Sequence, residues 1–333
     1  MRKQLPIYVA LALLLATAIG LAILVMYSFV SMAVAVLVML LGVAVLAILA
    51  LIAKRHMKHG GLAVQIGLIV VAAVGCLAVV VLQIAQVELY YPNRDDAASA
   101  ALAADPSMEK VSIDGKYVGW FVHRTDERAP LVLFFSGNGN CVSRWITGMD
   151  QLGYWDMADD ANFMMIDYPG YGDSSGQPSQ KSIFAMVTAT YDYAASRSDV
   201  DPARIVVEGY SIGTGPATYL ASQRDVAGLV LIAPYDNGID LYNSQLDIFH
   251  GPLTLLVTQR FTSDEYAQTV GVSPLIITST GDRTISHTLS ETLAAHFAQP
   301  ADLHVLSGLD HEDYFGSTDV RTLIAAYVEE VVS

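Results

Sequence analysis

Two segments of the chain match the pattern Gly-x-Ser-x-Gly, in which a serine has a glycine two residues away on each side. Ser211 lies between Gly209 and Gly213, after a strand-like run and before a helix-like segment. A strand, a sharp turn and a helix are the context that a nucleophilic serine requires. Ser174 follows a loop rich in turn residues, which favours an ordinary loop position. We therefore predict Ser211 as the nucleophile.

A serine hydroxyl is a weak nucleophile without a base that accepts its proton. In this strand–turn–helix context the acid and then the histidine follow the serine along the chain. His311 follows the last strand-like run through a short turn and precedes the final helical segment. The other histidines lie in a basic loop, within a strand, near helices or before the expected positions. The order of the chain therefore favours His311 as the base.

The base in turn needs an acid that orients it and stabilises its charge. Asp282 comes just after the apolar run Leu275–Thr278, at a position where a strand would end. Asp236 occupies a similar position one strand earlier and is the alternative. We predict Asp282 as the acid of the triad and keep Asp236 as the second candidate.

The oxyanion formed in acyl transfer needs two hydrogen-bond donors. The amide after the nucleophile, that of Ile212, is one candidate. The other is Asn138, in the glycine-containing loop Ser136–Asn140 that follows a strand-like run. A phosphate cradle is a weaker reading because this loop lacks the Gly-Lys-Ser/Thr of a P-loop. No metal-binding motif occurs, so we expect no metal and no cofactor.

These residues require a scaffold of strands that alternate with helices. Short apolar runs predict strands, and amphipathic segments between them predict helices at 182–196, 214–223, 289–298 and 320–331. This alternation indicates a mostly parallel sheet with helices on both faces, an α/β domain over residues 110–333. We expect a linker at 92–109 and a short cap at about 237–273. The predicted strands are 117–122, 131–135, 163–166, 205–207, 229–232, 275–278 and 303–306.

The first 91 residues have a different composition. No charged residue occurs between Lys3 and Lys54, and a single helix over this run would be about 70 Å long, far more than the roughly 30 Å of a hydrocarbon core. Three transmembrane helices are therefore expected, at about 6–27, 30–53 and 62–87. A cleaved signal peptide ending near Ala18 is the alternative, but the sequence stays apolar well beyond that point.

The charges are divided between the two parts of the chain. All five charged residues before Glu88 are positive, whereas the remainder has 13 Lys and Arg against 33 Asp and Glu, a net charge of −20. Positive loops stay in the cytoplasm, so we expect an integral protein of a bacterial inner membrane, with a cytoplasmic N-terminus and an extracytoplasmic catalytic domain. The acidity of that domain argues against a nucleic-acid partner. The two cysteines, Cys76 and Cys141, predict no disulfide.

Five blocks in order give the sequence a resemblance to the α/β-hydrolase superfamily. It is most similar to the membrane-anchored group that contains the bud-emergence-type hydrolases and the eukaryotic protein depalmitoylases. The resemblance implies the triad Ser211, Asp282 and His311, with Asn138 and Ile212 lining the oxyanion hole. Where that family usually has His-Gly before the oxyanion asparagine, this chain has Ser136-Gly137. The blocks are Phe134–Asn140, Asp167–Gly176, Gly209–Gly213, Gly281–Ile285 and Gly308–Phe315.

The triad and the resemblance together predict a membrane-anchored serine hydrolase. It would cleave carboxylic esters or thioesters of acyl or lipid-like substrates through an acyl-enzyme, with the lipid bilayer as a partner. Two alternatives are a serine peptidase on the same fold and a non-catalytic membrane receptor or scaffold that retains it. The sequence leaves the acyl chain, the leaving group and the oligomeric state open.

Overall fold

The computed structural model describes residues 90–125, 127–157, 160–245 and 247–333. The chain divides into two compact units, Met1–Leu89 and Tyr90–Ser333. The second unit contains all of the described residues and is treated by itself below.

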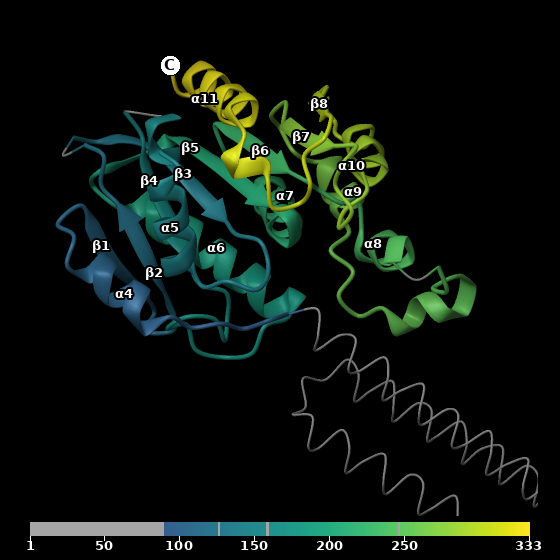
Figure 1. Ribbon diagram of the computed structural model, residues 1–333, viewed down its shortest axis with the longest axis horizontal. Helices are drawn as coiled ribbons and strands as arrows, with labels where there is room; N and C mark the ends of the chain where they lie inside the picture. The colour runs from purple at the N-terminus through teal and green to yellow at the C-terminus, as the bar shows by residue number, and fades with distance from the viewer. Residues whose placement is uncertain (1–89, 126, 158–159, 246) are drawn as a thin grey trace, which may run out of the picture. The chain divides into compact units, whose positions relative to one another are not determined.

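A single sheet of eight strands forms the centre of the described unit (Figure 1), in the order β1-β2-β4-β3-β5-β6-β7-β8. Strand β2 pairs antiparallel with β1 and β4, and all other neighbours are parallel. The strands are β1 (Met108–Ile113), β2 (Tyr117–Val122), β3 (Ala129–Phe135), β4 (Asn162–Ile166), β5 (Val200–Tyr210), β6 (Gly228–Ile232), β7 (Leu275–Ser279) and β8 (Asp302–Leu306).

The parallel strands at the centre of the sheet are covered on both faces. Every residue of β3, β4, β6 and β7 is buried. This explains why these strands appear in the sequence as continuous apolar runs rather than as an alternation of apolar and polar residues. The prediction of a mostly parallel α/β sheet is therefore confirmed.

Helices form a layer on each face of the sheet. On one face, α4 (Asp96–Ala103), α5 (Val142–Gln151) and α11 (Thr318–Val332) share an apolar core with alternate residues of the strands. Two short 3-10 helices, η1 (Tyr154–Met157) and η4 (Tyr314–Gly316), complete this layer. The opposite face is covered by α6 (Gln180–Ser196), α7 (Thr214–Gln223) and α10 (His287–Ala294).

The expected linker at 92–109 contains regular structure. Asp95 caps α4, accepting a hydrogen bond from the amide of Ala98 at 2.9 Å, and β1 begins at Met108. Strand β1 joins β2 through the three residues Asp114, Gly115 and Lys116. Asp114 and Gly115 have positive φ (52° and 63°), and the amide of Lys116 donates to the carbonyl of Ile113 at 3.0 Å, which closes the turn. Residues 92–109 are therefore part of the folded unit.

The segment expected to form a cap contains helices outside the two layers. These are α8 (Gly238–Gln245), the 3-10 helix η3 (Gly251–Leu256) and α9 (Ser263–Ala267). Three large apolar side chains of this segment are exposed, namely Ile248, Leu253 and Leu255.

The fold class expected from the sequence needs one correction. It combined the α/β-hydrolase fold with three transmembrane helices, but within the described residues no helix is long and apolar enough to cross a membrane. The longest, α6, has 17 residues and a polar outer face, whereas a span needs about 20 mostly apolar residues. The segments expected to span, 6–27, 30–53 and 62–87, lie outside the described residues.

Candidate active site

The predicted site residues gather at one edge of the sheet. Strands β3, β5, β7 and β8 are parallel, so the loops that follow them emerge at the same edge. Ser211 follows β5, Asp282 follows β7 and His311 follows β8. The carboxyl edge of an open parallel sheet is where such folds bind their ligands.

Ser211 lies in a sharp turn between strand and helix. Strand β5 ends at Tyr210, the 3-10 helix η2 (Ser211–Gly213) follows, and α7 begins at Thr214. The backbone of Ser211 has φ 54°, in the left-handed region that residues other than glycine and asparagine rarely adopt. A backbone held in such a region costs about 1–3 kcal/mol and persists only where the surrounding structure enforces it.

The two glycines of the motif are required by close packing of the backbone. A Cβ atom at Gly209 would lie 2.6 Å from the carbonyl oxygen of Gly213. A Cβ atom at Gly213 would lie 2.1 Å from the carbonyl oxygen of Phe135, at the end of β3. Both distances are too short for a side chain, so the turn can form only with glycine at these positions.

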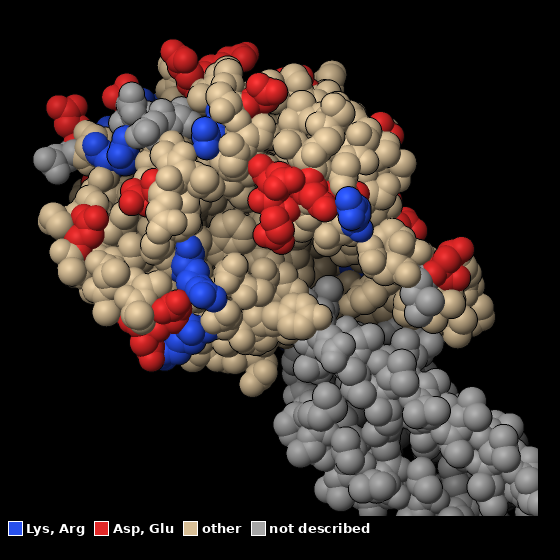
Figure 2. Space-filling view, viewed as in Figure 1, with Lys and Arg blue, Asp and Glu red and all other residues tan. Residues whose placement is uncertain are grey.

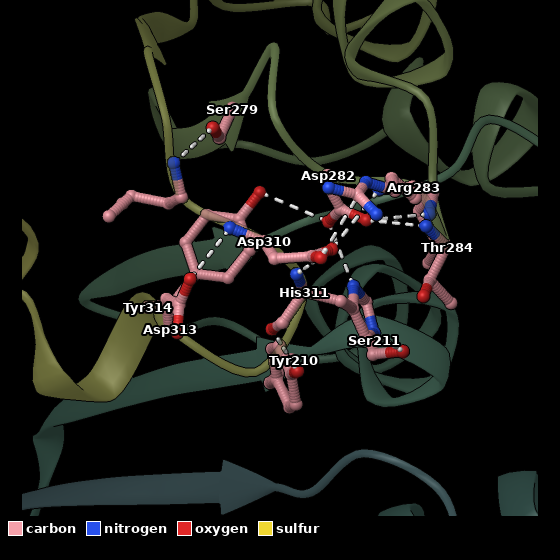
Figure 3. Close-up of polar contacts among 12 residues, drawn as sticks. Tyr210, Ser211, Ser279, Asp282, Arg283, Thr284, Asp310, His311, Asp313 and Tyr314 are labelled. Atoms are coloured by element: carbon pink, nitrogen blue, oxygen red, sulfur yellow. Dashed lines mark hydrogen bonds and ion pairs between the residues drawn. The ribbon is translucent and has the colours of Figure 1, made fainter.

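Ser211, His311 and Asp282 form a continuous hydrogen-bonded chain (Figure 3). His311 Nε2 lies 2.9 Å from Ser211 Oγ, and His311 Nδ1 lies 2.8 Å from Asp282 Oδ2. The residues are buried, with exposed fractions of 8% for Ser211 and Asp282 and 7% for His311. The structure therefore brings together the three residues that the sequence proposed, in the geometry that acyl transfer by a serine requires.

Asp282 is held in its ionised form by hydrogen bonds. Its Oδ1 accepts from the amides of Thr284 and Ile285 at 2.8 and 2.9 Å, and its Oδ2 accepts from Tyr314 at 3.1 Å as well as facing His311. Burial by itself raises the pKa of this carboxyl. The bonds from His311 and the two amides outweigh burial, so the pKa lies below its usual value. The carboxylate can therefore stabilise a positive imidazolium.

Tyr210 supports His311 in two ways. Its hydroxyl donates to the His311 carbonyl at 2.6 Å, and the two rings stack with centroids 5.1 Å apart. Tyr210 in turn packs edge-on against Trp145 and Phe315. Sequence reasoning missed both Tyr210 and Tyr314, although each lies inside or beside a motif that it had identified.

Asp236, the alternative acid, has a different environment. It is buried after β6, and its Oδ1 accepts a hydrogen bond from the amide of Asn237 at 2.9 Å. Burial raises its pKa to about 7, and the nearby Asp240 carboxylate contributes to the same direction. Of the two candidate acids, Asp282 is the one within hydrogen-bond distance of His311.

The two candidate oxyanion donors lie on segments that pack against each other. A Cβ atom at Gly137 would lie 3.5 Å from Ser211 Cβ, so the loop after β3 passes directly over the turn that carries Ser211. Asn138 is the next residue of this loop. Ile212 lies in the first turn of η2, and its carbonyl accepts a bond from Tyr235 at 3.3 Å. The roles of Asn138 and Ile212 as donors stay predictions.

Ser174, in the second Gly-x-Ser-x-Gly segment, is a structural residue. Its Oγ accepts from the amide of Val118 at 2.9 Å and donates to the carbonyl of Asp167 at 2.8 Å. The hydroxyl thus joins strand β2 to the loop after β4.

One group of three potential metal ligands occurs in the described part of the chain, formed by Glu109, His123 and Asp199. Arg197 already bonds the two carboxylates, at 2.8 Å to Glu109 and 2.6 Å to Asp199. Its guanidinium supplies the positive charge that a metal ion would bring, so this group is better described as an ion-pair network.

Comparisons with known proteins agree with this architecture. A family model described as the alpha/beta hydrolase fold matches residues 130–270. An uncharacterized protein of Mycobacterium tuberculosis is 31% identical over 235 residues, which cover 68% of this chain and 79% of that protein. The alpha/beta hydrolase domain-containing protein aho-3 of Caenorhabditis elegans is 30% identical over 202 residues, covering 61% of this chain and 56% of its own.

Solved structures share the fold at low sequence identity. An acetyl xylan esterase from Paenibacillus sp. R4 superimposes with a TM-score of 0.54 at 17% identity, covering 74% of this chain and 98% of its own. The thermophilic carboxylesterase EstE1, from a metagenomic library, gives 0.50 at 18% identity, covering 70% and 92%. The family match, the relatives and the strand order agree with one another, and the chain therefore belongs to the α/β-hydrolase superfamily.

Proposed function

We propose that this protein is a serine hydrolase that cleaves carboxylic esters or thioesters of acyl or lipid-like substrates. One observation carries the proposal, namely the unbroken path from Ser211 Oγ through both nitrogens of His311 to Asp282. A buried serine with a base at 2.9 Å, itself oriented by a carboxylate at 2.8 Å, has the features of an activated nucleophile.

The reaction would proceed through an acyl-enzyme. Ser211 Oγ attacks the substrate carbonyl carbon while its proton passes to His311 Nε2. The resulting oxyanion is stabilised by the amides of Ile212 and Asn138. When the tetrahedral intermediate collapses, His311 returns the proton to the leaving alcohol or thiol. A water molecule then repeats the sequence on the acyl-enzyme and releases the acid.

Asp282 has two tasks in this scheme. Its bond to Nδ1 fixes the tautomer in which Nε2 is free to accept the serine proton. Its negative charge then stabilises the imidazolium that forms. Because its four hydrogen bonds keep the pKa of Asp282 below its usual value, the carboxylate stays ionised while the histidine accepts and returns the proton.

Two observations support acyl substrates over polyanions. The described surface is strongly acidic, and Asp and Glu outnumber Lys and Arg on the face drawn in Figure 2. Such a surface repels polyanionic substrates. The cap segment exposes Ile248, Leu253 and Leu255, apolar side chains suited to an acyl chain. Two structural neighbours are named as esterases, which agrees with an ester substrate.

Association with a lipid bilayer and a location outside the cytoplasm are proposed from the sequence alone. They rest on the apolar, positively charged character of residues 1–87. An extracytoplasmic reporter enzyme fused after Ser333 should be active in cells. If only a cytoplasmic reporter were active there, the proposed location would be wrong.

The full chain should be tested on matched p-nitrophenyl esters and acyl thioesters of short, medium and long chain length. We expect hydrolysis that a fluorophosphonate abolishes by labelling Ser211. Peptide substrates of comparable size serve as the contrast. Absence of hydrolysis across the ester and thioester panel, together with equal labelling of wild type and Ser211→Ala, would refute the proposal.

A further inference from the structure

The block Asp167–Gly176 has no part in the mechanism above, yet two of its side chains contact the loop Ser136–Asn140, here called the oxyanion loop. Tyr168 donates to the carbonyl of Ser136 at 2.8 Å, and Tyr171 donates to Asn138 Oδ1 at 2.6 Å. Both tyrosines are buried, with exposed fractions of 3% and 1%. These hydroxyls therefore bond the loop from which one oxyanion donor is expected.

The oxyanion loop needs such support because of its own sequence. It contains Gly137 and Gly139, and Gly139 has φ 84°. Glycine allows the loop to approach Ser211 closely, but it also gives the backbone more conformational freedom than any other residue. A hydrogen-bond donor stabilises a transition state only if it is held in place beforehand. The restraint must therefore come from outside the loop.

The side chain of Asn138 accepts three of the hydrogen bonds that hold the oxyanion loop. Its Oδ1 accepts from the amide of Gly139 at 2.9 Å, from the amide of Tyr91 at 3.0 Å and from Tyr171 at 2.6 Å. Asn93 adds a bond from its Nδ2 to the carbonyl of Gly139 at 3.3 Å. The bond from Tyr171 is the shortest of the three and comes from the best-buried donor, so it is the strongest restraint on this side chain.

The block that carries the two tyrosines is itself fixed to the fold. Asp167 Oδ1 accepts from the amide of Val142, the first residue of α5, at 2.7 Å. A Cβ atom at Gly172 would lie 2.0 Å from Asp167 Oδ2, so the loop is closed tightly around this carboxyl. Ser174 adds its two bonds to the backbone. The tyrosines thus project from a loop that is hydrogen-bonded to α5 and to strand β2.

We infer that Tyr171 and Tyr168 are positioning residues for the oxyanion hole, with Tyr171 acting through the side chain of Asn138. This inference rests on the proposed function and adds to it. It also assigns a role to the second Gly-x-Ser-x-Gly segment, because Ser174 belongs to the block Asp167–Gly176, here called the brace, which carries the two tyrosines. In this chain, Ser136 replaces the histidine usual in the related group, and the tyrosine bonds hold the loop here.

The first test is the kinetics of Tyr171→Phe in the full chain. Loss of one hydrogen bond should lower kcat roughly 3- to 10-fold, with little change in KM, because the donor acts on the transition state and not on the bound ester. The affinity for a trifluoromethyl ketone, which forms a tetrahedral oxyanion on Ser211, should fall by a similar factor. Tyr168→Phe should show the same pattern with a smaller change.

Tyr327→Phe is the matched control. Its hydroxyl donates to the carbonyl of Ser273 at 2.6 Å and accepts from the amide of Leu229 at 3.1 Å, at the start of strand β6 and away from the carboxyl edge. This variant also loses the hydrogen bonds of a tyrosine hydroxyl to the backbone, from a half-buried position. It should therefore lower the melting temperature but leave kcat and the ketone affinity unchanged.

A double-mutant cycle with Asn138→Ala tests the route of the effect. If Tyr171 acts through Asn138, Tyr171→Phe should have little further effect on kcat in the Asn138→Ala background. Fully additive losses would overturn the route. A Tyr171→Phe variant that loses thermal stability but keeps wild-type kcat and ketone affinity would overturn the inference while the esterase function stands. Failure of the proposed function would appear separately, as a wild-type protein without hydrolysis.

Discussion

The two Gly-x-Ser-x-Gly segments share a pattern of five residues but place their serines in different environments. Both serines are buried, with exposed fractions of 8% for Ser211 and 6% for Ser174. Ser211 has φ 54° and faces a histidine. The hydroxyl of Ser174 is bonded to the backbone on both its donor and its acceptor side.

The difference lies in what surrounds each serine. After β5 the chain turns sharply into a helix, so Ser211 Oγ projects at the edge of the sheet where a base can reach it. After β4 the chain closes around Asp167, and Ser174 is turned inward to join two segments. The turn and the neighbouring histidine therefore distinguish the proposed nucleophile Ser211 from Ser174, and the glycine pattern alone does not.

The largest expected effect comes from exchanging each serine for alanine. Ser211→Ala should lower kcat by a factor on the order of 10⁵ to 10⁶ and abolish fluorophosphonate labelling. Ser174→Ala should retain labelling and most of the activity. If Ser174→Ala were the variant that loses fluorophosphonate labelling, the assignment of Ser211 as the nucleophile would be wrong.

Exchanging each of the two candidate acids for asparagine should also have very different effects on kcat. Asp282→Asn keeps the size of the side chain but favours the wrong tautomer of His311, so kcat should fall by a factor of roughly 10⁴. Asp236→Asn should change kcat far less, because Asp236 bonds the amide of Asn237 and not the histidine. Steady-state kinetics of both variants decide this, and a greater loss in Asp236→Asn would reverse the assignment.

A buried carboxyl precedes each Gly-x-Ser-x-Gly segment, and both carboxyls should make the free energy of unfolding depend on pH. Glu208 lies just before the Ser211 segment, receives a hydrogen bond from Tyr154, and its second oxygen is without a partner among the described residues. Burial raises its pKa to about 8, and burial likewise raises that of Asp167 to about 7. Both groups therefore bind protons more tightly in the folded state than in the unfolded state.

Their contribution to stability is fully present at acidic pH and is lost as the pH rises through the folded-state pKa. The melting temperature should therefore fall between about pH 5 and about pH 9. Glu208→Gln cannot ionise, so this variant should be more stable than wild type at about pH 9, by on the order of a few kcal/mol. An unchanged pH profile in Glu208→Gln would show that Glu208 does not titrate with the fold.

The smallest expected effect is on the stability of the brace. Ser174→Ala leaves the amide of Val118 and the carbonyl of Asp167 without this partner, which costs about 1–3 kcal/mol. Urea denaturation should show a lower midpoint with an unchanged slope. Equal stability of Ser174→Ala and wild type would mean that Ser174 is not part of the support.

Much of the fold could be predicted from the sequence because the central strands are buried on both faces. Apolar runs located β2 at its observed bounds and the parallel strands to within a few residues. Strand β1 was missed because only alternate residues, such as Val111 and Ile113, are buried. Strand β5 is longer than predicted because its first part, including Asp201 and Arg204, is polar.

The three residues of the candidate triad could also be predicted from the sequence. Ser211, Asp282 and His311 each follow a strand, and strand ends can be read from local sequence. The supporting tyrosines could not be found in this way. Tyr171 and Asn138 are 33 positions apart, and Tyr210 and His311 are 101 apart. Such contacts depend on how the loops meet in the folded chain.

The short stretch from Tyr91 to Asn93 sets the boundary of a minimal enzyme. It precedes the first helix and the first strand, yet it bonds both Asn138 and Gly139 of the oxyanion loop. A shortened chain that begins at β1 would retain the triad and all eight strands. It would lose two of the bonds that hold the loop and also helix α4, whose Leu102 is part of the core, so we expect it to be less stable and to turn over more slowly. The catalytic unit therefore begins at Tyr90.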